Sequence, residues 1–321
     1  MKSNKVKTCK KCSIKEGIRL LNDFFPVSED FEKENSNIKR VRINESGFCT
    51  YCEIYEKNYD YDLISDEVAN FVNSDFENMS KEKTLVAVSG GKDSLTALYI
   101  AKVLLKMDPI AVTYDNGFIP NIVIEQTRRI CSELEIEYKI IKKELYNEFK
   151  DEYYKTISGS WESKTGIDFC QICSKHIGTS IQEVCKSTGI HKVIYGDKTY
   201  TQLEPSVSCL KYYYYLDDKK NVHDIVKINL LFALKINPKK QKLILDLIKW
   251  EDPKLPGYTS NCLIPGFVEY PRSLKGLKND AGYLEMELRS GCYKKSEIKK
   301  IKDEKIVDLS NEIDIFFEKQ N

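Results

Sequence analysis

The residues of this chain that most directly suggest chemistry form a glycine-rich turn, Ser89-Gly-Gly-Lys-Asp-Ser94. The turn follows an apolar, β-branched run from Thr84 to Val88 that predicts a buried strand, and it precedes a helical repeat of apolar residues between Ser94 and Met107. At the carboxyl end of such a strand, Gly90 and Gly91 allow the backbone to approach an anion closely. Because the free amides and the dipole of the following helix also favour negative charge, the sequence predicts a phosphate-binding loop.

The side chains of this turn add groups that a nucleotide would use. Lys92 supplies a positive charge, and the hydroxyls of Ser89 and Ser94 can donate hydrogen bonds to phosphate. Asp93 is expected to hold magnesium or to orient the nucleotide. The G-x-x-x-x-G-K-[ST] spacing of a Walker A loop is missing, so a different class of ATP-binding loop is indicated.

Two C-x2-C pairs ahead of this loop predict a metal-binding module. Two thiolates from each pair can surround one ion, and a short segment of this kind needs such a cross-link to fold. We expect a structural zinc ion, with iron as the alternative, and no open coordination position for catalysis. The four predicted ligands are Cys9, Cys12, Cys49 and Cys52.

A third C-x2-C pair, Cys170 and Cys173, follows the loop, and Cys262 lies 92 residues after Cys170. Three thiolates on a [4Fe-4S] cluster leave one iron open, whereas four usually make a closed electron-transfer centre. We therefore expect a cluster at these three residues. Three other interpretations stay open: a catalytic dithiol that forms a persulfide and then a disulfide, a zinc site that includes His176, and plain structural cysteines.

The hexapeptide from Ser89 to Ser94 resembles the PP-loop of the ATP pyrophosphatases, the adenine nucleotide α-hydrolase-like superfamily, at every position. This resemblance implies an enzyme that splits ATP into AMP and pyrophosphate in order to adenylate a substrate oxygen. It also implies that the loop after the second strand, where Asp115 and Asn116 stand, contacts the adenosine.

The cysteine patterns resemble two groups within that superfamily. A C-x2-C pair inside the nucleotide domain with a third cysteine at this distance is similar to the iron-sulfur tRNA 2-thiolation enzymes. Paired C-x2-C knuckles ahead of the PP-loop are similar to modules found in some tRNA thiolation enzymes and in N-acetyl sugar amidotransferases.

The alternation of strand and helix patterns predicts an α/β protein with a doubly wound parallel sheet, an N-terminal zinc-ribbon-like module and a helical C-terminal extension. We divide the chain into a four-cysteine zinc-binding module (1–58), a connecting helix (59–83), a PP-loop ATP pyrophosphatase domain (84–250), and a cysteine-bearing loop with a helical region (251–321). The loop is expected to run from Glu251 to Pro271. The helical region offers core or dimer contacts at Val307, Leu309, Ile313, Ile315 and Phe316.

The composition suits a globular protein with a sizeable core: 321 residues, of which 41% are hydrophobic. Lys and Arg number 50 against 49 Asp and Glu, so the formal net charge is +1 and no overall field steers the chain toward nucleic acid. The N-terminus lacks the apolar core of a signal peptide and no apolar run is long enough to cross a membrane, so we expect a cytoplasmic protein. In a reducing compartment, 11 cysteines favour metal binding over disulfides.

Together these features predict an ATP-dependent sulfurtransferase that adenylates a carbonyl oxygen, releases pyrophosphate and replaces the oxygen by sulfur. Its expected cofactors are ATP, magnesium, zinc and the [4Fe-4S] cluster. Its expected partners are a sulfur donor (sulfide, or a persulfide or thiocarboxylate carrier), a small-molecule or carrier-protein-bound acceptor, and a second copy of the chain, with no membrane. The residues expected to carry the chemistry are Lys92, Asp93, Cys170, Cys173, Cys262 and Asp197.

The acceptor is the least constrained part of this hypothesis. The tRNA thiolation enzymes usually carry G-H-N-x-x-D-D after the fourth strand, whereas this chain has Gly196-Asp-Lys-Thr-Tyr-Thr-Gln. That departure and the near-neutral charge favour a small-molecule or carrier-bound amide over tRNA, with Asp197 and Lys198 beside the acceptor. Three alternatives remain: an N-acetyl sugar amidotransferase, which would use ammonia and would not need the last three cysteines, a tRNA 2-thiolation enzyme, and a nonenzymatic nucleotide sensor.

Overall fold

The computed structural model describes most of the chain, apart from several connecting segments. The described residues are 6–17, 41–58, 66, 70, 83–157, 169–196, 210–234, 236–257, 259–274, 283–289, 291, 293–302 and 307–319. Of the predicted connecting helix (59–83), only Asp66, Asn70 and Lys83 fall within these ranges, and Lys83 is the first residue of a strand.

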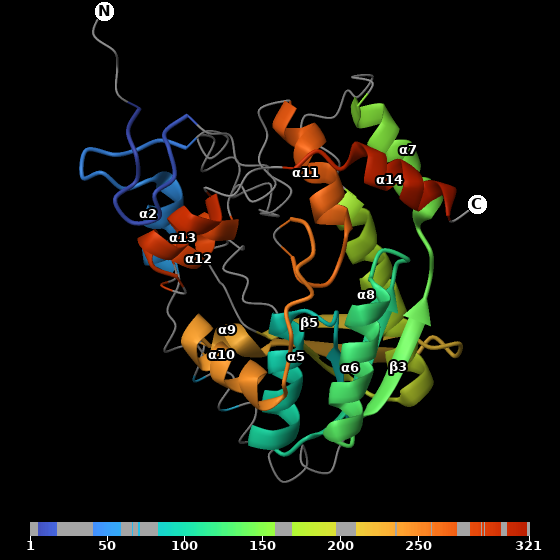
Figure 1. Cartoon of the computed structure of the whole chain (residues 1–321). Coiled ribbons are helices and arrows are strands. Elements are labelled where there is room, and N and C mark those ends of the chain that lie inside the picture. The colour runs from blue at the N-terminus through green and yellow to red at the C-terminus, as the bar shows by residue number, and fades with distance from the viewer. Residues whose placement is uncertain are drawn as a thin grey trace, which may run out of the picture.

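A six-stranded sheet forms the centre of the molecule, with the strand order β3-β2-β1-β4-β6-β5 (Figure 1). Five of these strands are parallel, and β5 pairs antiparallel with β6 at one edge. The predicted doubly wound α/β fold is confirmed, and the antiparallel edge strand is an addition to it. The strands are β1 (Lys83–Ala87), β2 (Asp108–Asp115), β3 (Glu137–Lys142), β4 (Lys192–Tyr195), β5 (Leu210–Leu216) and β6 (Val222–Asn229).

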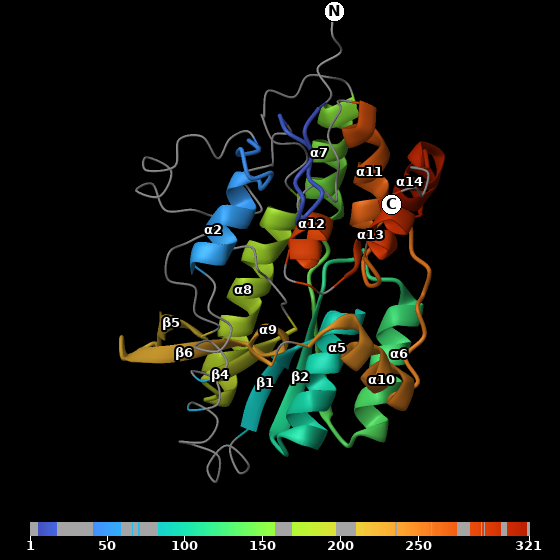
Figure 2. The same cartoon turned by 90° about the vertical axis from the view of Figure 1, so that its left-hand side faces the viewer.

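Helices cover both faces of the sheet. Figure 2 shows α8 on one side of the strands and α5, α6 and α10 on the other. Side chains alternate along β1, so that Leu85 packs with the α8 side and Val86 with the opposite side. The flanking helices are α5 (Lys92–Tyr99), α6 (Asn121–Glu133), α7 (Tyr146–Ile157), α8 (Phe169–Thr188), α9 (Leu230–Ala233) and α10 (Pro238–Leu247).

The helix after the glycine-rich turn differs from the expected Ser94–Met107. The α-helix α5 begins at Lys92 and ends at Tyr99, and the chain continues as a π-helical segment, η2 (Ile100–Leu104), in which the Leu105 N–H donates to the Ile100 carbonyl at 2.9 Å. Five residues are too few for the spacing of apolar side chains to distinguish these two helix types.

The segment 251–271, expected to be a loop, is a loop only as far as Leu263. Helix α11 (Ile264–Leu274) begins there, with Pro265 in its first turn, where no intrahelical N–H is required. Cys262 therefore lies immediately before a helix.

Helix α11 packs against α7 and a C-terminal helix, α14 (Ser310–Glu318), to form a second hydrophobic cluster above the sheet (Figure 1). Phe118 lies at its centre, with ring centroids 4.9 Å from Phe149 and 5.2 Å from Phe316. Of the predicted C-terminal contacts, Ile313 is fully buried, whereas Ile315 is exposed.

Two further C-terminal helices, α12 (Tyr283–Arg289) and α13 (Lys295–Lys302), lie beside helix α2 (Thr50–Asn58) of the four-cysteine module (Figure 1). The predicted helical C-terminal region is thus confirmed, and its two parts pack in different places. In the described part of the chain, no helix combines the length and the apolar character that crossing a membrane requires.

We predict that Phe149→Ala lowers the free energy of unfolding by roughly 3–5 kcal/mol, because it removes a fully buried ring from the second cluster. Chemical denaturation of the full chain measures this change. The control, Ile122→Ala on the exposed face of α6, should alter stability by less than about 0.5 kcal/mol. Equal stability of the two variants would show that the cluster does not support the fold.

Candidate functional site

The glycine-rich turn lies at the carboxyl end of β1, as the sequence predicts. Gly90 has a φ of +81°, a left-handed conformation that disfavours any other residue, and a Cβ there would meet the Val123 side chain at 2.4 Å. The indole N–H of Trp250 donates to the Gly90 carbonyl at 3.4 Å. The turn is therefore fixed from two sides, by α6 and by Trp250, which lies shortly after α10.

Ser89 and Ser94 connect the two ends of the turn. The Ser89 N–H donates to the Ser94 Oγ at 3.1 Å, and the Ser94 hydroxyl donates to the Gly91 carbonyl at 3.0 Å. This pair holds the turn closed around the amides at the start of α5. Those amides provide the anion-binding end of a helix.

Lys92 and Asp93 are both engaged by residues far away in the sequence. The Lys92 ammonium donates to the Tyr293 hydroxyl at 3.2 Å and lies 5.8 Å from the centre of that ring. Burial lowers the pKa of Lys92, but the charges of Asp93, Tyr293 and Glu287 outweigh burial, so the pKa is raised and the ammonium stays charged. The Asp93 carboxylate accepts a 2.6 Å hydrogen bond from the Gln241 amide.

A cavity of about 550 Å³ opens beside this turn, between α8 and the carboxyl ends of the strands. The turn contributes hydroxyl and carboxylate groups to it, and the sheet and α8 contribute mainly apolar and aromatic side chains. Tyr213, Ile225 and Lys227 of the β5–β6 hairpin also line the cavity. The Lys227 ammonium lies 4.3 Å from the centre of the Tyr195 ring. The volume and lining suit a nucleotide or another planar molecule.

The loop after β2 turns sharply through two side-chain hydrogen bonds. Asp115 Oδ1 accepts from the Gly117 N–H at 2.9 Å, and Asn116 Oδ1 accepts from the Phe118 N–H at 2.9 Å. The Asn116 amide nitrogen then faces two sulfurs, Cys173 Sγ at 3.4 Å and Cys262 Sγ at 3.9 Å. This asparagine, expected at the adenosine, lies at the cysteine site, and the adenosine contact stays a prediction.

The structure brings the three predicted cluster ligands toward one place. Cys170 and Cys173 lie in the first turns of α8, and Cys262 approaches from the loop before α11. The Cys173 and Cys262 sulfurs lie near each other, because both approach the same Asn116 amide nitrogen. Cys170 lies close enough to both thiols to contribute to their raised pKa values. Burial raises the pKa of Cys173 to about 11 and that of Cys262 to about 12.

These three sulfurs are spread more widely than the ligands of a single ion. Among the described residues, only the four N-terminal cysteines form a group compact enough to hold one metal ion. A tetrahedral zinc site with Zn–S bonds of about 2.3 Å requires sulfurs roughly 3.8 Å apart. The iron-sulfur cluster at Cys170, Cys173 and Cys262 stays a prediction.

The loop that carries Cys262 also touches the glycine-rich turn. The Lys92 N–H points at the Ser260 Oγ, 3.5 Å away. A Cβ at Gly91 would come within 3.3 Å of both Ser260 Oγ and Asn261 Oδ1. The three-cysteine site and the predicted phosphate site are therefore neighbours.

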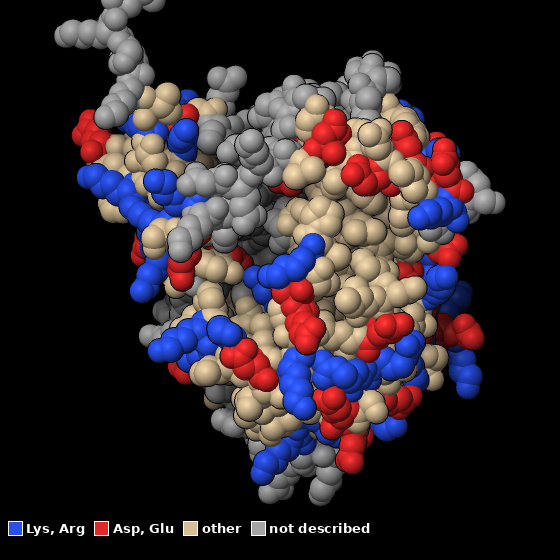
Figure 3. All heavy atoms as spheres, viewed as in Figure 1, with Lys and Arg blue, Asp and Glu red and all other residues tan. Residues whose placement is uncertain are grey.

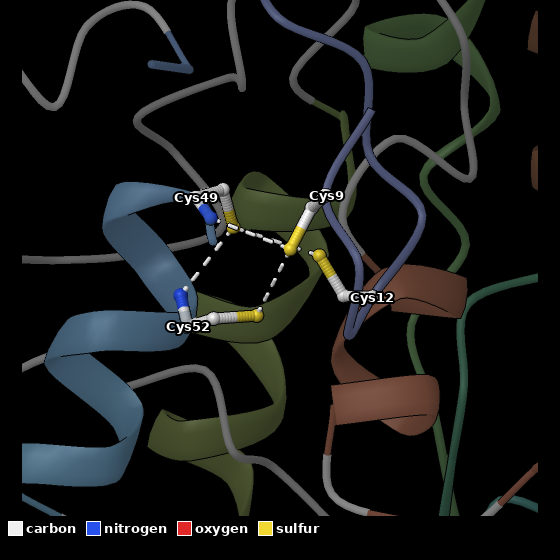
Figure 4. Close-up of side chains that lie close together, drawn as sticks. All are labelled: Cys9, Cys12, Cys49 and Cys52. Atoms are coloured by element: carbon white, nitrogen blue, oxygen red, sulfur yellow. Dashed lines mark hydrogen bonds between the residues drawn. The ribbon is translucent and has the colours of Figure 1, made fainter. Parts of the chain in front are cut away.

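The four N-terminal cysteines point toward one another from two segments, the loop that begins the described chain and the start of α2 (Figure 4). Their sulfurs lie 3.7 Å apart between Cys9 and Cys52 and 3.6 Å apart between Cys12 and Cys49. These distances match the edges of a tetrahedron around zinc. All four side chains are buried, so the site has the closed geometry of a structural metal centre.

Arg289 of α12 reaches this cysteine group from the other end of the chain. Its Nε donates to Cys52 Sγ at 3.4 Å and its Nη2 to Cys12 Sγ at 3.9 Å, while the side chain is only 2% exposed. A buried cation favours the ionised thiolate, which is the form that binds metal. The hydrogen bonds with Cys12 and Cys49, and to a smaller extent the Arg289 guanidinium, lower the pKa of Cys52.

Some predicted site residues fall outside the described part of the chain, and some observed contacts were not predicted. Asp197 and Lys198 lie outside the described residues, directly after Gly196, which lines the cavity. Sequence reasoning missed the contacts of five residues, because their partners lie far away in the sequence: Gln241, Ser260, Asn261, Arg289 and Tyr293. One available signal was the position of Ser260 and Asn261 directly before Cys262.

Comparisons with known proteins give partial matches, and no protein-family model matches the chain. The uncharacterized protein MJ1599 of Methanocaldococcus jannaschii is 27% identical over 193 residues, covering 59% of this chain and 62% of that protein. A 7-cyano-7-deazaguanine synthase of Clostridium botulinum is 40% identical over 70 residues, 22% of this chain and 32% of the synthase. An NH3-dependent NAD+ synthetase of Campylobacter jejuni is 26% identical over 83 residues, 26% of this chain and 34% of the synthetase.

Among solved structures, two similar ones have low superposition scores. The tRNA thiolase NcsA of Methanococcus maripaludis, solved with its [4Fe-4S] cluster, is 16% identical with a TM-score of 0.38, over 91% of this chain and 87% of that one. The NH3-dependent NAD synthetase of Campylobacter jejuni is 17% identical with a TM-score of 0.34, over 76% and 93% of the two chains.

We predict that Cys12→Ser removes about one equivalent of zinc per chain, because a tetrahedral site that loses one of its four thiolates binds the ion far less tightly. Elemental analysis of the purified protein measures this loss. The matched control is Cys131→Ser, which changes a buried cysteine in the hydrophobic core beneath the sheet and should leave the zinc content unchanged. Retention of zinc in Cys12→Ser would contradict the four-thiolate assignment.

Proposed function

We propose that this chain is an ATP-dependent sulfurtransferase of the PP-loop class of ATP-using enzymes, the adenine nucleotide α-hydrolase-like superfamily, supported by its Ser89–Ser94 hexapeptide and by the partial matches to ATP-using synthases and synthetases. The observation that carries the proposal is the placement of Cys170, Cys173 and Cys262 beside the PP-loop. The Asn116 amide lies between two of the sulfurs, and the loop carrying Cys262 contacts the residues that would hold phosphate. An activated substrate in the cavity would thus lie next to a sulfur-binding site.

The first step is transfer of AMP to a substrate oxygen. The PP-loop amides and the Ser89 and Ser94 hydroxyls hold the phosphates, and the carbonyl oxygen of the acceptor attacks the α-phosphorus. The bond from that phosphorus to its bridging oxygen breaks, and pyrophosphate departs. Lys92 stays charged beside this group and stabilises the negative charge that develops on it. Magnesium, if held by Asp93, would also stabilise the negative charge on the departing pyrophosphate.

The second step replaces the activated oxygen. A sulfide-level sulfur nucleophile adds to the carbon that bears the adenylate, and AMP leaves with the original carbonyl oxygen. No electrons are gained or lost overall, because sulfide is already reduced. A [4Fe-4S] cluster on the three thiolates would supply an iron at which such a sulfur atom can bind. The protein itself holds the three cysteines beside the PP-loop and orients Asn116 toward them.

The acceptor that best suits the cavity is a small-molecule or carrier-bound amide. Its lining is largely apolar and aromatic and includes Tyr213 and Lys227. On the face seen in Figure 3, basic and acidic side chains are interspersed among uncharged ones. Among the described residues, that face offers no continuous basic patch of the kind that supplies the many phosphate contacts of tRNA binding.

An ATP-dependent amidotransferase is the second candidate, favoured by the matches to a synthase and to an ammonia-dependent synthetase. There ammonia would take the place of sulfide after the same adenylation step. The three clustered cysteines distinguish the two, because ammonia transfer gives them no role. Incubation with ATP and either sulfide or ammonium, followed by mass analysis of candidate amides and N-acetyl sugars, separates sulfur products from nitrogen products.

We predict that anaerobically purified protein holds about four irons and four sulfides per chain, in addition to about one zinc. The change Cys262→Ala should remove the iron and sulfide and leave the zinc, because the two cysteine sites share no ligands. Elemental and sulfide analysis with a visible spectrum measures this.

Cys185→Ala is the control, since this buried cysteine lies in the last turns of α8, packs against the sheet away from the three sulfurs, and its loss should leave the iron bound. Zinc as the sole metal, with no iron bound after anaerobic reconstitution, would rule out the cluster. The cysteines would then act as a free dithiol, or the second candidate would apply.

We predict that Lys92→Met weakens the binding of magnesium ATP by at least about tenfold, because the variant removes a charged group from the phosphate site. Isothermal titration of the full chain measures this without an acceptor. Lys102→Met in η2, which alters an exposed lysine bonded to the Glu135 carbonyl, should bind ATP like the wild type. Equal affinity of all three proteins would show that the PP-loop lysine does not contact the nucleotide.

A further inference from the structure

We propose that Ser260 and Asn261 complete the phosphate site of the PP-loop, so that the position of Cys262 depends on whether that site is occupied. The inference rests on the proposed function in one respect, that the PP-loop binds the phosphates of ATP. Two contacts place Ser260 and Asn261 at the phosphate site. The Lys92 N–H faces the Ser260 Oγ, and the side chains of Ser260 and Asn261 both lie beside Gly91.

Phosphate binding would change the hydrogen-bond partners of the Lys92 N–H and the Ser260 hydroxyl, because phosphate oxygens are strong acceptors. The Lys92 N–H stands at the first residue of α5, where helix amides have no intrahelical acceptor and favour anions. A phosphate oxygen is a stronger acceptor than a serine hydroxyl, so it takes this N–H. The Ser260 hydroxyl then donates to the phosphate, and the Asn261 amide, whose Oδ1 faces Gly91, rotates to offer its two N–H groups. Both residues thereby move onto the anion.

One hydrogen bond and a short turn connect this event with Cys262. The Thr259 hydroxyl donates to the Cys262 carbonyl at 3.1 Å and closes a turn that contains Ser260 and Asn261. Because the turn is only four residues long, a shift of its middle residues moves the residue at its end. The sulfur of Cys262 lies 3.9 Å from the Asn116 amide, so its place in the three-cysteine site changes with that shift.

The substitution Asn261→Asp tests the contact with phosphate, because it keeps the shape of the side chain and replaces donors by negative charge. With magnesium pyrophosphate as the probe, we expect both Asn261→Asp and Ser260→Ala to raise the Kd by at least about tenfold. Ser187→Ala, at the far end of α8, is the control and should bind like the wild type.

Fluorescence of Trp250 reports binding, since its indole donates to the Gly90 carbonyl in the PP-loop. The experiment uses the full chain in a Trp161→Phe background, which leaves Trp250 as the single tryptophan. A circular dichroism spectrum that matches the wild type shows that a variant is folded, so that its weaker binding does not result from unfolding.

The second measurement is the rate at which N-ethylmaleimide modifies Cys262, read by peptide mass spectrometry on protein prepared without iron. Saturating pyrophosphate should change this rate several-fold in the wild type and leave it unchanged in Asn261→Asp at the same concentration. Cys131, buried in the core, is the internal control.

The outcomes separate the two hypotheses. Normal pyrophosphate affinity in both variants overturns the inference and leaves the proposed function standing. A weakened affinity together with a Cys262 rate that pyrophosphate does not alter also overturns it, because the coupling is then absent. A wild-type protein that binds neither ATP nor pyrophosphate overturns the proposed function itself, and the inference with it.

Discussion

The close approach of the Cys262 loop to the glycine-rich turn is the contact on which the arrangement of the site depends. Gly91 leaves room for it, because a methyl group there would lie 3.3 Å from Ser260 Oγ and Asn261 Oδ1 and would force these side chains to shift. On the other side, Gly90 requires a left-handed backbone that lets α6 pack against the turn. Two adjacent glycines thus have different tasks, one conformational and one steric. Together they let three segments distant in sequence meet at one strand end.

The two cysteine sites differ in ways that match different chemistry. The N-terminal four are fully buried, and their sulfurs are spaced as around one ion. The other three are partly exposed, with Cys170 the most open, and their sulfurs do not form a single-ion group among the described residues. A closed, compact set stabilises a fold, whereas an open, wider set leaves room for a reacting atom. This contrast supports different roles for the two sites within one chain.

Local patterns explain which parts of this protein could be predicted from its sequence. The buried β1 and β2 strands, the PP-loop and the C-x2-C pairs each depend on neighbours a few residues away, and the structure has them where expected. The antiparallel strand β5 could not be distinguished from a parallel one, because pairing direction is set by the connection rather than by its tyrosines. The contact of Asn116 with two sulfurs depends on how α8 and α11 pack, and no spacing in the chain encodes it.

The reach of Arg289 to Cys52 has a consequence for how the protein is made. These residues are 237 positions apart, so on the ribosome the cysteines emerge long before their arginine does. The Arg289 side of the cysteine group therefore stays uncovered until the residues between Cys52 and Arg289 have been synthesised. Contacts of such long range are entropically costly to close and form late in folding. The four-cysteine module is thus completed only after the α/β sheet that lies between its two parts in the sequence has been made.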